Sequence, residues 1–392
     1  MKKNFTLSIC LLLLGFTMLN AKERKVFFIG IDGVRSDALI KANTPVMDSI
    51  FKTGFHTYTS WHIGITVSAP SWSSMLCGVW EPKHGVTSNA YTNSKYDRYP
   101  YFTTRAKEYR PDLYAVQITS WSPMSDKVYN DGWNEKIIVN SDDAVIEAAK
   151  VALKNPELDI LFTHIDDADA VGHGNGFNPN LPIYVNQLEY IDKQVGELIA
   201  ALKARPNYEE EDWLILFTTD HGGIGTGHGG ITREEKRIWW AASGSTVDPG
   251  LIEINVNDVT QWFKAPMLVD IGVTALDHLL PDVDPTKVAA WNLEGKSWLS
   301  QRAATPVREQ VIDARQFKIY PNPANDWVRI ESPALSVEWI RILDTKGSLV
   351  KELKGTVNRL VYEIPTGDLT PAAYIIQINT EEGLASRAFV KF

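Results

Sequence analysis

The sequence predicts an α/β protein with a mainly parallel sheet flanked by helices, followed by a small C-terminal antiparallel β-sandwich. Three short apolar runs, 25–31, 159–165 and 213–219, are bounded by polar residues, as is typical of strands buried on both faces. Helical patterns lie between these runs, and strands that alternate with helices indicate a parallel sheet. From Phe317 onward, short alternating runs are separated by Pro-Asn, Lys-Gly and Glu-Glu-Gly turns, which favours a small β-sandwich.

Three segments between the predicted strands have helical patterns. The first, TPVMDSIFKTG, has Thr44 as a candidate N-cap, Pro45 at the first helical position and Gly54 just past the end. The others are 142–155 and 183–204, and in the latter the apolar residues recur at spacings of three and four. We therefore expect helices on the faces of the sheet.

The N-terminus predicts a secretory signal peptide over residues 1–21. Lys2 and Lys3 precede the apolar run LSICLLLLGFTML, which has the length of a signal-peptide core and is too short to cross a bilayer comfortably. The small residue Ala21 comes just before the charged run KERK, so we expect cleavage after it. The rival interpretation is an uncleaved membrane anchor. The mature chain is expected to contain no transmembrane span.

The mature chain is expected to have three parts. These are an α/β domain over 22–305, a linker over 306–315 and the β-domain over 316–392. By our count the β-domain carries nine basic and nine acidic side chains, so the whole formal charge of −9 belongs to the preceding part. This excess of acid is consistent with a site built partly from carboxylates, although solvated surface acids are the commoner reason.

The composition excludes several classes of protein. With 44% hydrophobic and 22% charged residues the chain can bury a substantial core. Its 39 Lys and Arg against 48 Asp and Glu argue against generic binding to nucleic-acid duplexes or anionic membranes, because both need a surplus of basic residues. Cys10 lies in the predicted signal peptide, which leaves Cys77 as the one mature thiol and excludes a disulfide framework.

Acidic residues follow each of the three predicted central strands. Asp32 and Asp220 come directly after their strands, and Asp169 comes four residues after the second strand. Since ligands of an open parallel sheet bind outside the carboxyl ends of its strands, these acids are expected to converge. Any one of them alone is better explained as an N-cap or turn residue.

Histidines near these acids favour a metal site. His173 stands four residues after Asp169, His221 directly follows Asp220, and His228 lies in the Gly-rich run GTGHGG. Imidazole and carboxylate are ligands that zinc prefers, and glycines let the backbone approach an ion or a ligand. Six ligands in two mixed sets are enough for two metals. The alternative is that all of them are solvated turn residues.

A candidate nucleophile lies between the first two strands. Pro70 suits the first turn of a helix over SWSSMLCG, so Ser68 would stand just before a helix N-terminus, where N–H groups and the macrodipole favour an anion. Ser and Thr before helices are ordinarily N-caps. The residues alone leave the choice open among Thr66, Ser68 and Ser71.

Together these motifs resemble the alkaline phosphatase superfamily, most closely its nucleotide pyrophosphatase and phosphodiesterase branch, over about residues 25–299. That likeness implies an alkaline phosphatase-like fold, two divalent metal ions, most plausibly Zn²⁺, and Ser68 in Ser-Ala-Pro as both nucleophile and metal ligand. It implies the following ligand sets: Asp32, Asp220 and His221 beside Ser68 for one ion, and Asp169, His173 and His228 for the other. Asn89 resembles the side chain that donates to a phosphoryl oxygen.

The resemblance implies a secreted two-metal hydrolase of phosphodiester or pyrophosphate bonds that works through a covalent phosphoserine, with a phosphate ester, including a nucleotide, as substrate. The alternatives are a sulfatase or phosphomonoesterase on the same scaffold, or a non-catalytic surface binding protein. Sulfatases of this superfamily carry C/S-x-P-S-R, and here Trp72 replaces the Arg. Among the other histidines, His84 is expected to order the turn after the nucleophile helix and His164 to lie near the metal ligands.

The C-terminal part resembles the type A sorting domain of proteins exported by the type IX secretion system. The runs YPNPANDWVRI, VEWIRILDTKGSLV and PAAYIIQI to RAFVKF correspond to its opening, middle and final strands. This resemblance implies a secretion machinery as partner and a secreted or outer-surface protein of a diderm bacterium. The alternative is a carbohydrate-binding or structural β module.

Overall fold

The computed structural model describes residues 22–129, 131–299, 316–332, 337–344, 348–355, 360–380 and 383–392. The predicted signal peptide and linker lie outside these residues and stay predictions. Among the described residues, no helix combines the length and the apolar character that a membrane crossing needs.

An eight-stranded sheet forms the centre of the first part, in the order β4-β3-β5-β1-β6-β7-β2-β8. Its strands are β1 (Glu23–Ile31), β2 (Phe55–Trp61), β3 (Tyr114–Thr119), β4 (Glu135–Ile138), β5 (Leu158–Ile165), β6 (Glu211–Thr218), β7 (Arg237–Ser243) and β8 (Gly250–Leu251). Only β7 runs against its neighbours; the pairs from β4 to β6 are all parallel. The prediction of a mainly parallel sheet is confirmed.

The three predicted strands are the three central ones. β1 lies between β5 and β6, with Phe28 beside Phe162 on one side and Leu216 on the other. All eight residues of β5 are buried, as are residues 25–31 of β1. A strand that is covered on both faces reads as a continuous apolar run, which is why periodicity located these strands well.

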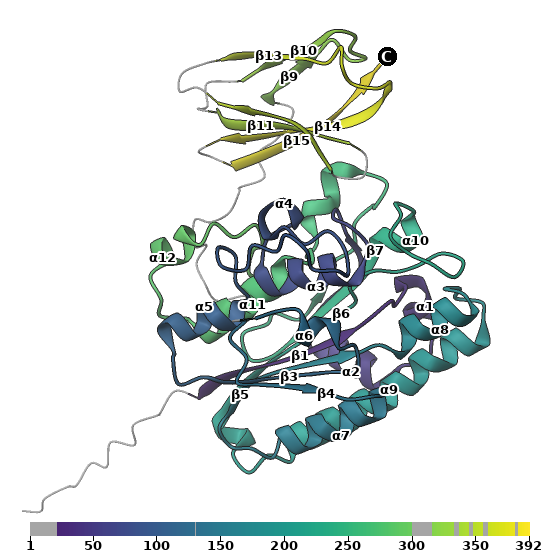
Figure 1. The fold of residues 1–392 in the computed structure, drawn as a ribbon, viewed down its shortest axis with the longest axis vertical. Coiled ribbons are helices and arrows are strands. Elements are labelled where there is room, and N and C mark those ends of the chain that lie inside the picture. Colours follow the sequence, from purple (N-terminus) through teal and green to yellow (C-terminus); the bar gives the residue numbers. More distant parts are fainter. Residues whose placement is uncertain are drawn as a thin grey trace, which may run out of the picture.

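Helices cover both faces of the sheet, as Figure 1 shows. They are α1 (Ser36–Lys41), α2 (Pro45–Thr53), α3 (Ser68–Cys77), α4 (Glu81–His84), α5 (Phe102–Tyr109), α6 (Pro123–Asp126), α7 (Asp142–Ala152), α8 (Asp167–Asn175), α9 (Pro182–Lys203), α10 (Arg233–Lys236), α11 (Asp270–Leu279) and α12 (Pro285–Ala290), with 3-10 turns η1 (Tyr208–Glu210) and η2 (Val259–Lys264). Alternate residues of β1 pack into two separate cores. Phe28 joins α3, α5 and α11, whereas Phe27 joins α2, α7 and α9.

The three predicted helices are present as α2, α7 and α9, and Thr44 takes the N-cap position of α2 as predicted. Its side chain makes no capping hydrogen bond to α2. Instead, the carboxylate of Asp192 on α9 accepts from Val46 N (3.1 Å) and Met47 N (2.8 Å). The free N–H groups of a helix start need an acceptor, and here a neighbouring helix supplies it.

The C-terminal part consists of two antiparallel sheets, β13-β10-β9 and β12-β11-β14-β15. Their strands are β9 (Lys318–Tyr320), β10 (Trp327–Glu331), β11 (Val337–Asp344), β12 (Leu349–Lys354), β13 (Val361–Pro365), β14 (Ala372–Thr380) and β15 (Gly383–Lys391). Side chains of both sheets, among them Ile330, Ile340 and Phe389, share one core, so the predicted β-sandwich is confirmed. The four-stranded sheet faces the α/β part (Figure 1), where Leu343 and Ile375 pack near Trp262.

Candidate active site

A fully buried trio of Asp32, Asp220 and His221 lies at the carboxyl ends of β1 and β6. His221 Nε2 is 3.6 Å from Asp32 Oδ1 and 3.1 Å from Asp220 Oδ2. The three residues are brought together because β1 and β6 are parallel neighbours, so their carboxyl ends meet at one edge. We call this group the buried trio.

The atoms that face one another in the buried trio have no hydrogen-bond partner among the described residues. These atoms are Asp32 Oδ1, Asp220 Oδ2 and His221 Nε2. The other side-chain polar atoms of Asp220 and His221 have partners. Asp220 Oδ1 accepts from Gly33 N (3.1 Å) and His221 N (2.9 Å), and His221 Nδ1 lies 2.9 Å from Gly222 O. Since a carbonyl only accepts, Nδ1 carries the hydrogen and Nε2 presents a lone pair.

A second group, the exposed trio, consists of Asp169, His173 and His228. Asp169 and His173 are one turn apart on α8, with His173 Nε2 3.2 Å from Asp169 Oδ2. His228 comes from the loop after β6, and its Nε2 is 3.1 Å from His173 Nε2 and 3.8 Å from Asp169 Oδ1. The His173 side chain is 46% exposed.

Both histidines of the exposed trio are oriented by backbone carbonyls. His173 Nδ1 lies 2.9 Å from Thr226 O, and His228 Nδ1 lies 2.9 Å from Thr66 O. Each Nδ1 therefore donates, and two Nε2 lone pairs face each other at 3.1 Å. Metal-binding histidines are commonly held in this way, and a cation between the two nitrogens removes the repulsion between their lone pairs.

The two trios form one continuous site. The rings of His221 and His228 stack at 3.7 Å between centroids, and Asp169 can offer a ligand atom together with both of them. Gly33 lies in the turn between Asp32 and α1 at φ +67°, and a Cβ there would lie 2.6 Å from the Asp169 side chain. Only glycine fits this position, because it accepts the positive φ and leaves room for Asp169.

The electrostatics of the site call for added positive charge. Burial, and next the charge of Asp220, raise the pKa of Asp32 well above its usual value; burial does the same for Asp220. Burial and the charge of Asp32 raise the pKa of Asp169 to about 9. Within the described part of the chain the ion-pair partners of these three acids are all histidines.

His221 and His228, in turn, are neutral. Burial, with the neighbouring His221, lowers the pKa of His228 to about 3, and burial lowers that of His221. Neutral imidazoles with outward lone pairs and buried carboxylates without a cationic partner are the donor set of a divalent metal site such as zinc. The residues therefore fit the metals that the sequence predicted.

Ser68 lies at the start of α3, on a segment whose neighbouring residues contact both trios. It is the first residue of the helix, rather than the residue before it as predicted, and Val67 takes the N-cap position. The Thr66 carbonyl two residues earlier holds His228, and Trp72 four residues later donates from Nε1 to Asp32 Oδ2 (2.9 Å). The helix start is thus fixed to one residue of each trio.

The other candidate nucleophiles have engaged hydroxyls. Thr66 Oγ1 donates to Gly230 O (2.9 Å), and Ser71 Oγ donates to Ile65 O (3.1 Å) while facing His62 Nε2 (2.9 Å). Ser68 Oγ has no such partner among the described contacts. This difference favours Ser68, which the sequence pattern alone did not separate from its neighbours.

Asn89 lies against the same helix start. Its Oδ1 accepts from Ala69 N (3.0 Å), so the Oδ1 atom is occupied and the Nδ2 group is the donor that Asn89 can offer. The helix offers fewer free N–H groups than expected, because Ala69 N is used and Pro70 has none. Ser68 N is the remaining donor of the first three helix residues.

A buried acid and a buried base hold the loop before Ser68. Glu81 Oε1 accepts from Ile65 N (2.6 Å), and Lys236 Nζ donates to Gly64 O, so both bond the same peptide unit. Burial raises the pKa of Glu81 to about 7 and lowers that of Lys236 to about 8. Neither residue was singled out from the sequence, because both lie far from the motifs.

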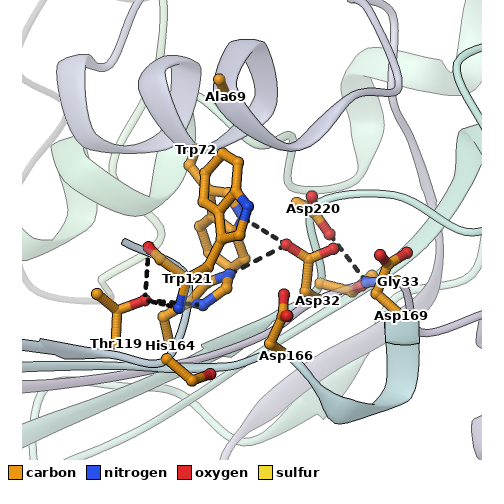
Figure 2. Close-up of polar contacts among 12 residues, drawn as sticks. Asp32, Gly33, Ala69, Trp72, Thr119, Trp121, His164, Asp166, Asp169 and Asp220 are labelled. Atoms are coloured by element: carbon orange, nitrogen blue, oxygen red, sulfur yellow. Dashed lines mark hydrogen bonds and ion pairs between the residues drawn. The ribbon is translucent and has the colours of Figure 1, made fainter. Parts of the chain in front are cut away.

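Two further expectations concern histidines. His84 lies 2.9 Å from Ser74 Oγ through Nε2 and accepts from Val86 N, so it orders the turn after α3 as predicted. His164, on β5, lies 3.0 Å from Asp32 Oδ2 through Nε2, and Asp166 lies close to both (Figure 2). The sequence gave no signal for Asp166.

The fold and the acid–histidine clusters define an α/β protein with a candidate metal site, and comparison with known proteins identifies its family. The family model for type I phosphodiesterase / nucleotide pyrophosphatase matches residues 26–231, more than half of the chain. The chain therefore belongs to the type I phosphodiesterase / nucleotide pyrophosphatase family. Residues 318–391 match the secretion system C-terminal sorting domain, which indicates secretion or an outer-surface location.

Curated relatives match the α/β part. Human ectonucleotide pyrophosphatase/phosphodiesterase family member 5 is 23% identical over 224 residues, covering 52% of this chain and 46% of that protein. The bis(5′-adenosyl)-triphosphatase ENPP4 of Bos taurus is 23% identical over 221 residues, covering 52% and 48%. The chain thus spans about half the length of these relatives.

Solved structures agree on the fold. A 2-O GAG sulfatase superposes with a TM-score of 0.52 at 13% sequence identity, covering 88% of this chain and 85% of that chain. At this identity the likeness concerns the fold alone. It confirms the predicted alkaline phosphatase-like architecture, since sulfatases are members of that superfamily.

Proposed function

We propose that this protein is a secreted metal-dependent hydrolase of phosphodiester or pyrophosphate bonds, with Ser68 as its nucleophile. The observation that carries the proposal is the cluster of two adjoining acid–histidine trios, in which Asp32 Oδ1, Asp169 Oδ1, Asp220 Oδ2 and His221 Nε2 have no hydrogen-bond partner among the described residues. The segment that begins α3 at Ser68 contacts both trios. Family membership supports the reaction class.

The buried trio would hold one divalent ion and the exposed trio a second, with zinc as the ion that suits these ligands best. Bound ions supply Lewis-acid stabilisation of the negative charge on the attacking and leaving oxygens. The protein's own part is to fix the ligands, and it does so through backbone partners on the far side of each imidazole: Gly222 O, Thr226 O and Thr66 O.

In the first step Ser68 Oγ loses its proton to solvent and attacks phosphorus, and the bond between phosphorus and the leaving oxygen breaks. A phosphoserine forms and the leaving group departs, protonated by solvent. In the second step water attacks the same phosphorus, the Ser68 Oγ–phosphorus bond breaks, and a phosphate monoester is released. The serine regains its proton.

A diester or pyrophosphate suits the site better than a monoester. The two donors that Ser68 and Asn89 offer at the helix start, the Ser68 N–H and the Asn89 Nδ2 group, are neutral. Neutral donors stabilise the single charge of a diester phosphoryl group, whereas a monoester brings a second charge that needs a cation. Asn89 is therefore assigned to a non-bridging oxygen.

The test replaces Ser68 with Ala in the mature protein. We expect turnover of bis-p-nitrophenyl phosphate or p-nitrophenyl thymidine monophosphate to fall at least roughly a thousandfold, while bound zinc per chain stays near the wild-type value. Acid quenching followed by mass spectrometry should find, in the wild type only, the peptide that contains Ser68 carrying the phosphoryl group with its remaining ester substituent, p-nitrophenyl or thymidine.

Thr66→Ala is the matched comparison, since that hydroxyl is occupied by Gly230 O. Full activity of the Ser68 variant together with loss in the Thr66 variant would move the nucleophile to Thr66. Faster turnover of p-nitrophenyl phosphate or p-nitrophenyl sulfate than of the diesters would instead favour a phosphomonoesterase or a sulfatase. No turnover of any ester by the zinc-loaded wild type would leave a binding protein.

A further inference from the structure

The two oxygens of Asp32 have different surroundings. Oδ2 accepts from Trp72 Nε1 (2.9 Å) and contacts His164 Nε2 (3.0 Å), whereas Oδ1 has no partner among the described residues and faces His221. Figure 2 shows both contacts meeting at the same oxygen. The carboxylate is therefore held by one oxygen and presents the other.

The donors come from two elements on either side of Asp32. His164 belongs to β5 and lies beside Gly30 in the register with β1, two residues before Asp32. Trp72 belongs to α3, and its ring lies over Gly30, where a Cβ would come within 2.5 Å of it. Asp32, Trp72 and His164 are all 0% exposed, so water does not replace either donor.

The tautomer of His164 follows from its neighbours. Asp32 Oδ2 only accepts, so Nε2 carries the hydrogen, and Nδ1 lies 3.2 Å from Thr119 Oγ1. The His164 ring also meets the Trp72 ring edge to face at 5.0 Å. The two donors thus support each other as well as the carboxylate.

We propose that Trp72 and His164 are positioning residues that fix Asp32 with Oδ1 toward the cation of the buried trio and withhold Oδ2 from any further cation. The proposal rests on the proposed function only in taking the buried trio as a cation site. Trp72 has a second effect, because it lies one turn after Ser68 on the same helix and so ties the nucleophile to the metal ligand.

The competing arrangement is a third cation held by Asp32, His164 and Asp166, whose ligand atoms lie within 4.8 Å of one another. His164 Nε2 cannot donate to Asp32 and bind a cation at once. The 3.0 Å contact and the second donor on the same oxygen favour the hydrogen bond.

The experiment compares zinc binding by four full-length mature variants with the wild type. Trp72→Phe removes the indole N–H with little change in volume, His164→Leu removes the ring donor, and His164→Gln keeps an N–H at a similar reach. Trp240→Phe is the matched control, because that tryptophan is also 0% exposed and its Nε1 has no partner among the described residues.

Zinc affinity is measured by competition with a chromophoric chelator, and the number of bound ions by elemental analysis. Trp72→Phe and His164→Leu should each lower the zinc affinity of the buried trio roughly 10- to 100-fold. The number of ions bound at saturating zinc should stay the same. His164→Gln should stay within a few-fold of the wild type, and Trp240→Phe should match it. Trp72→Phe alone should also lower kcat at saturating zinc.

Wild-type affinity in both Trp72→Phe and His164→Leu overturns the proposal. So does the loss of one whole ion in His164→Leu with the affinity for the others unchanged, since His164 would then be a ligand. Zinc affinity is measured independently of turnover. If the wild type is inactive but the variants show the expected changes in affinity, the proposed function is contradicted and this inference is supported. Thermal unfolding identifies a variant that is misfolded, and His164→Gln then decides.

Discussion

The same three strands bury charge at both of their ends, in opposite ways. At the amino ends, Lys25 Nζ on β1 lies 2.9 Å from Asp159 of β5 and 3.9 Å from Glu211 of β6, and Arg205 forks onto Glu211 at 2.7 and 2.8 Å. At the carboxyl ends, Asp32 and Asp220 have no cationic side chain beside them in the described structure. One end is neutralised by the chain itself and the other is not.

This difference separates charge that serves the fold from charge that serves a ligand. A buried acid needs a compensating charge, since the cost of taking it out of water is several kcal/mol. At the amino ends that charge is covalently part of the protein. At the carboxyl ends the raised pKa values of Asp32 and Asp220 mark the same need left open, which a bound cation fills.

The largest effect is expected from Asp220→Asn, which removes one of the two uncompensated acids at the carboxyl ends of the strands. The zinc affinity of the buried trio and the turnover rate should both fall by about a thousandfold or more, because the amide supplies no negative charge to the ion. The metal-free variant should be at least as stable as the metal-free wild type, since an uncompensated buried acid is gone. Elemental analysis, diester turnover and thermal unfolding measure these outcomes.

Asp212→Asn, near the opposite end of the same strand and less buried, is the control. It should keep zinc and turnover. A stable, zinc-loaded and active Asp220→Asn protein would contradict the assignment of Asp220 to a cation.

Lys25→Met removes the compensating cation at the amino ends of the strands instead. Removing the lysine leaves Asp159 buried without its partner, so the free energy of unfolding should drop by about 3 to 5 kcal/mol. Zinc affinity should be unchanged. Urea unfolding of the zinc-loaded protein measures the loss, and Lys150→Met, which removes an exposed ion pair with Glu147, should cost at most about 1 kcal/mol.

His173→Ala tests the exposed trio, where solvent substitutes for a lost ligand. Zinc at this position should bind roughly a hundredfold more weakly, a change of about 2.7 kcal/mol, and excess zinc should restore most of the turnover. The measurement is turnover against free zinc concentration. Activity that no zinc concentration restores would mean that this trio is as intolerant as the buried one.

An intermediate case, Glu81, tests the comparison through pH, since this buried acid has a lysine nearby and still has a raised pKa of about 7. A raised pKa means that Glu81 contributes stability which is fully present below pH 4.5 and lost as pH rises through about 7. Relative to wild type, Glu81→Gln should therefore gain about 3 kcal/mol between pH 4 and pH 7.

The matching measurement is urea unfolding of both zinc-loaded proteins across that pH range. A constant difference between them would show that Glu81 keeps an ordinary pKa in the folded protein. Gln is the chosen replacement because its Oε1 can still accept from Ile65 N.

Much of the site was predictable where local pattern decides position. Asp32 and Asp220 follow strands that are long apolar runs, and neighbouring parallel strands bring their carboxyl ends together. Asp169 and His173 are four apart, which places them on one face of a helix. His228 was singled out by its place in a Gly-rich run, but its assignment to the set with Asp169 and His173 came only from resemblance to a family, because its loop has no periodicity that fixes its path.

The rest depended on packing between distant segments, which no local pattern carries. Trp72 appeared in the sequence only as a departure from a sulfatase motif, yet its N–H determines which oxygen of Asp32 is presented. The side chain that accepts from the first N–H groups of α2 is that of Asp192, rather than that of the N-cap residue Thr44. The reversed strand β7 was not predicted, because a fully buried strand has the same apolar run whichever way it points.

Gly30 lies outside the proposed active site but affects it, because its lack of a side chain leaves room for the Trp72 ring. Its Cα faces the Trp72 ring, so even a methyl group there would push the indole off the strand. The disturbance would pass to the carboxylate and to the serine's helix together, without any change in a residue that meets substrate. Tolerance to mutation near the carboxyl end of β1 is therefore limited by the packing of Trp72 and Phe162 on Gly30 as well as by the side chain of Asp32.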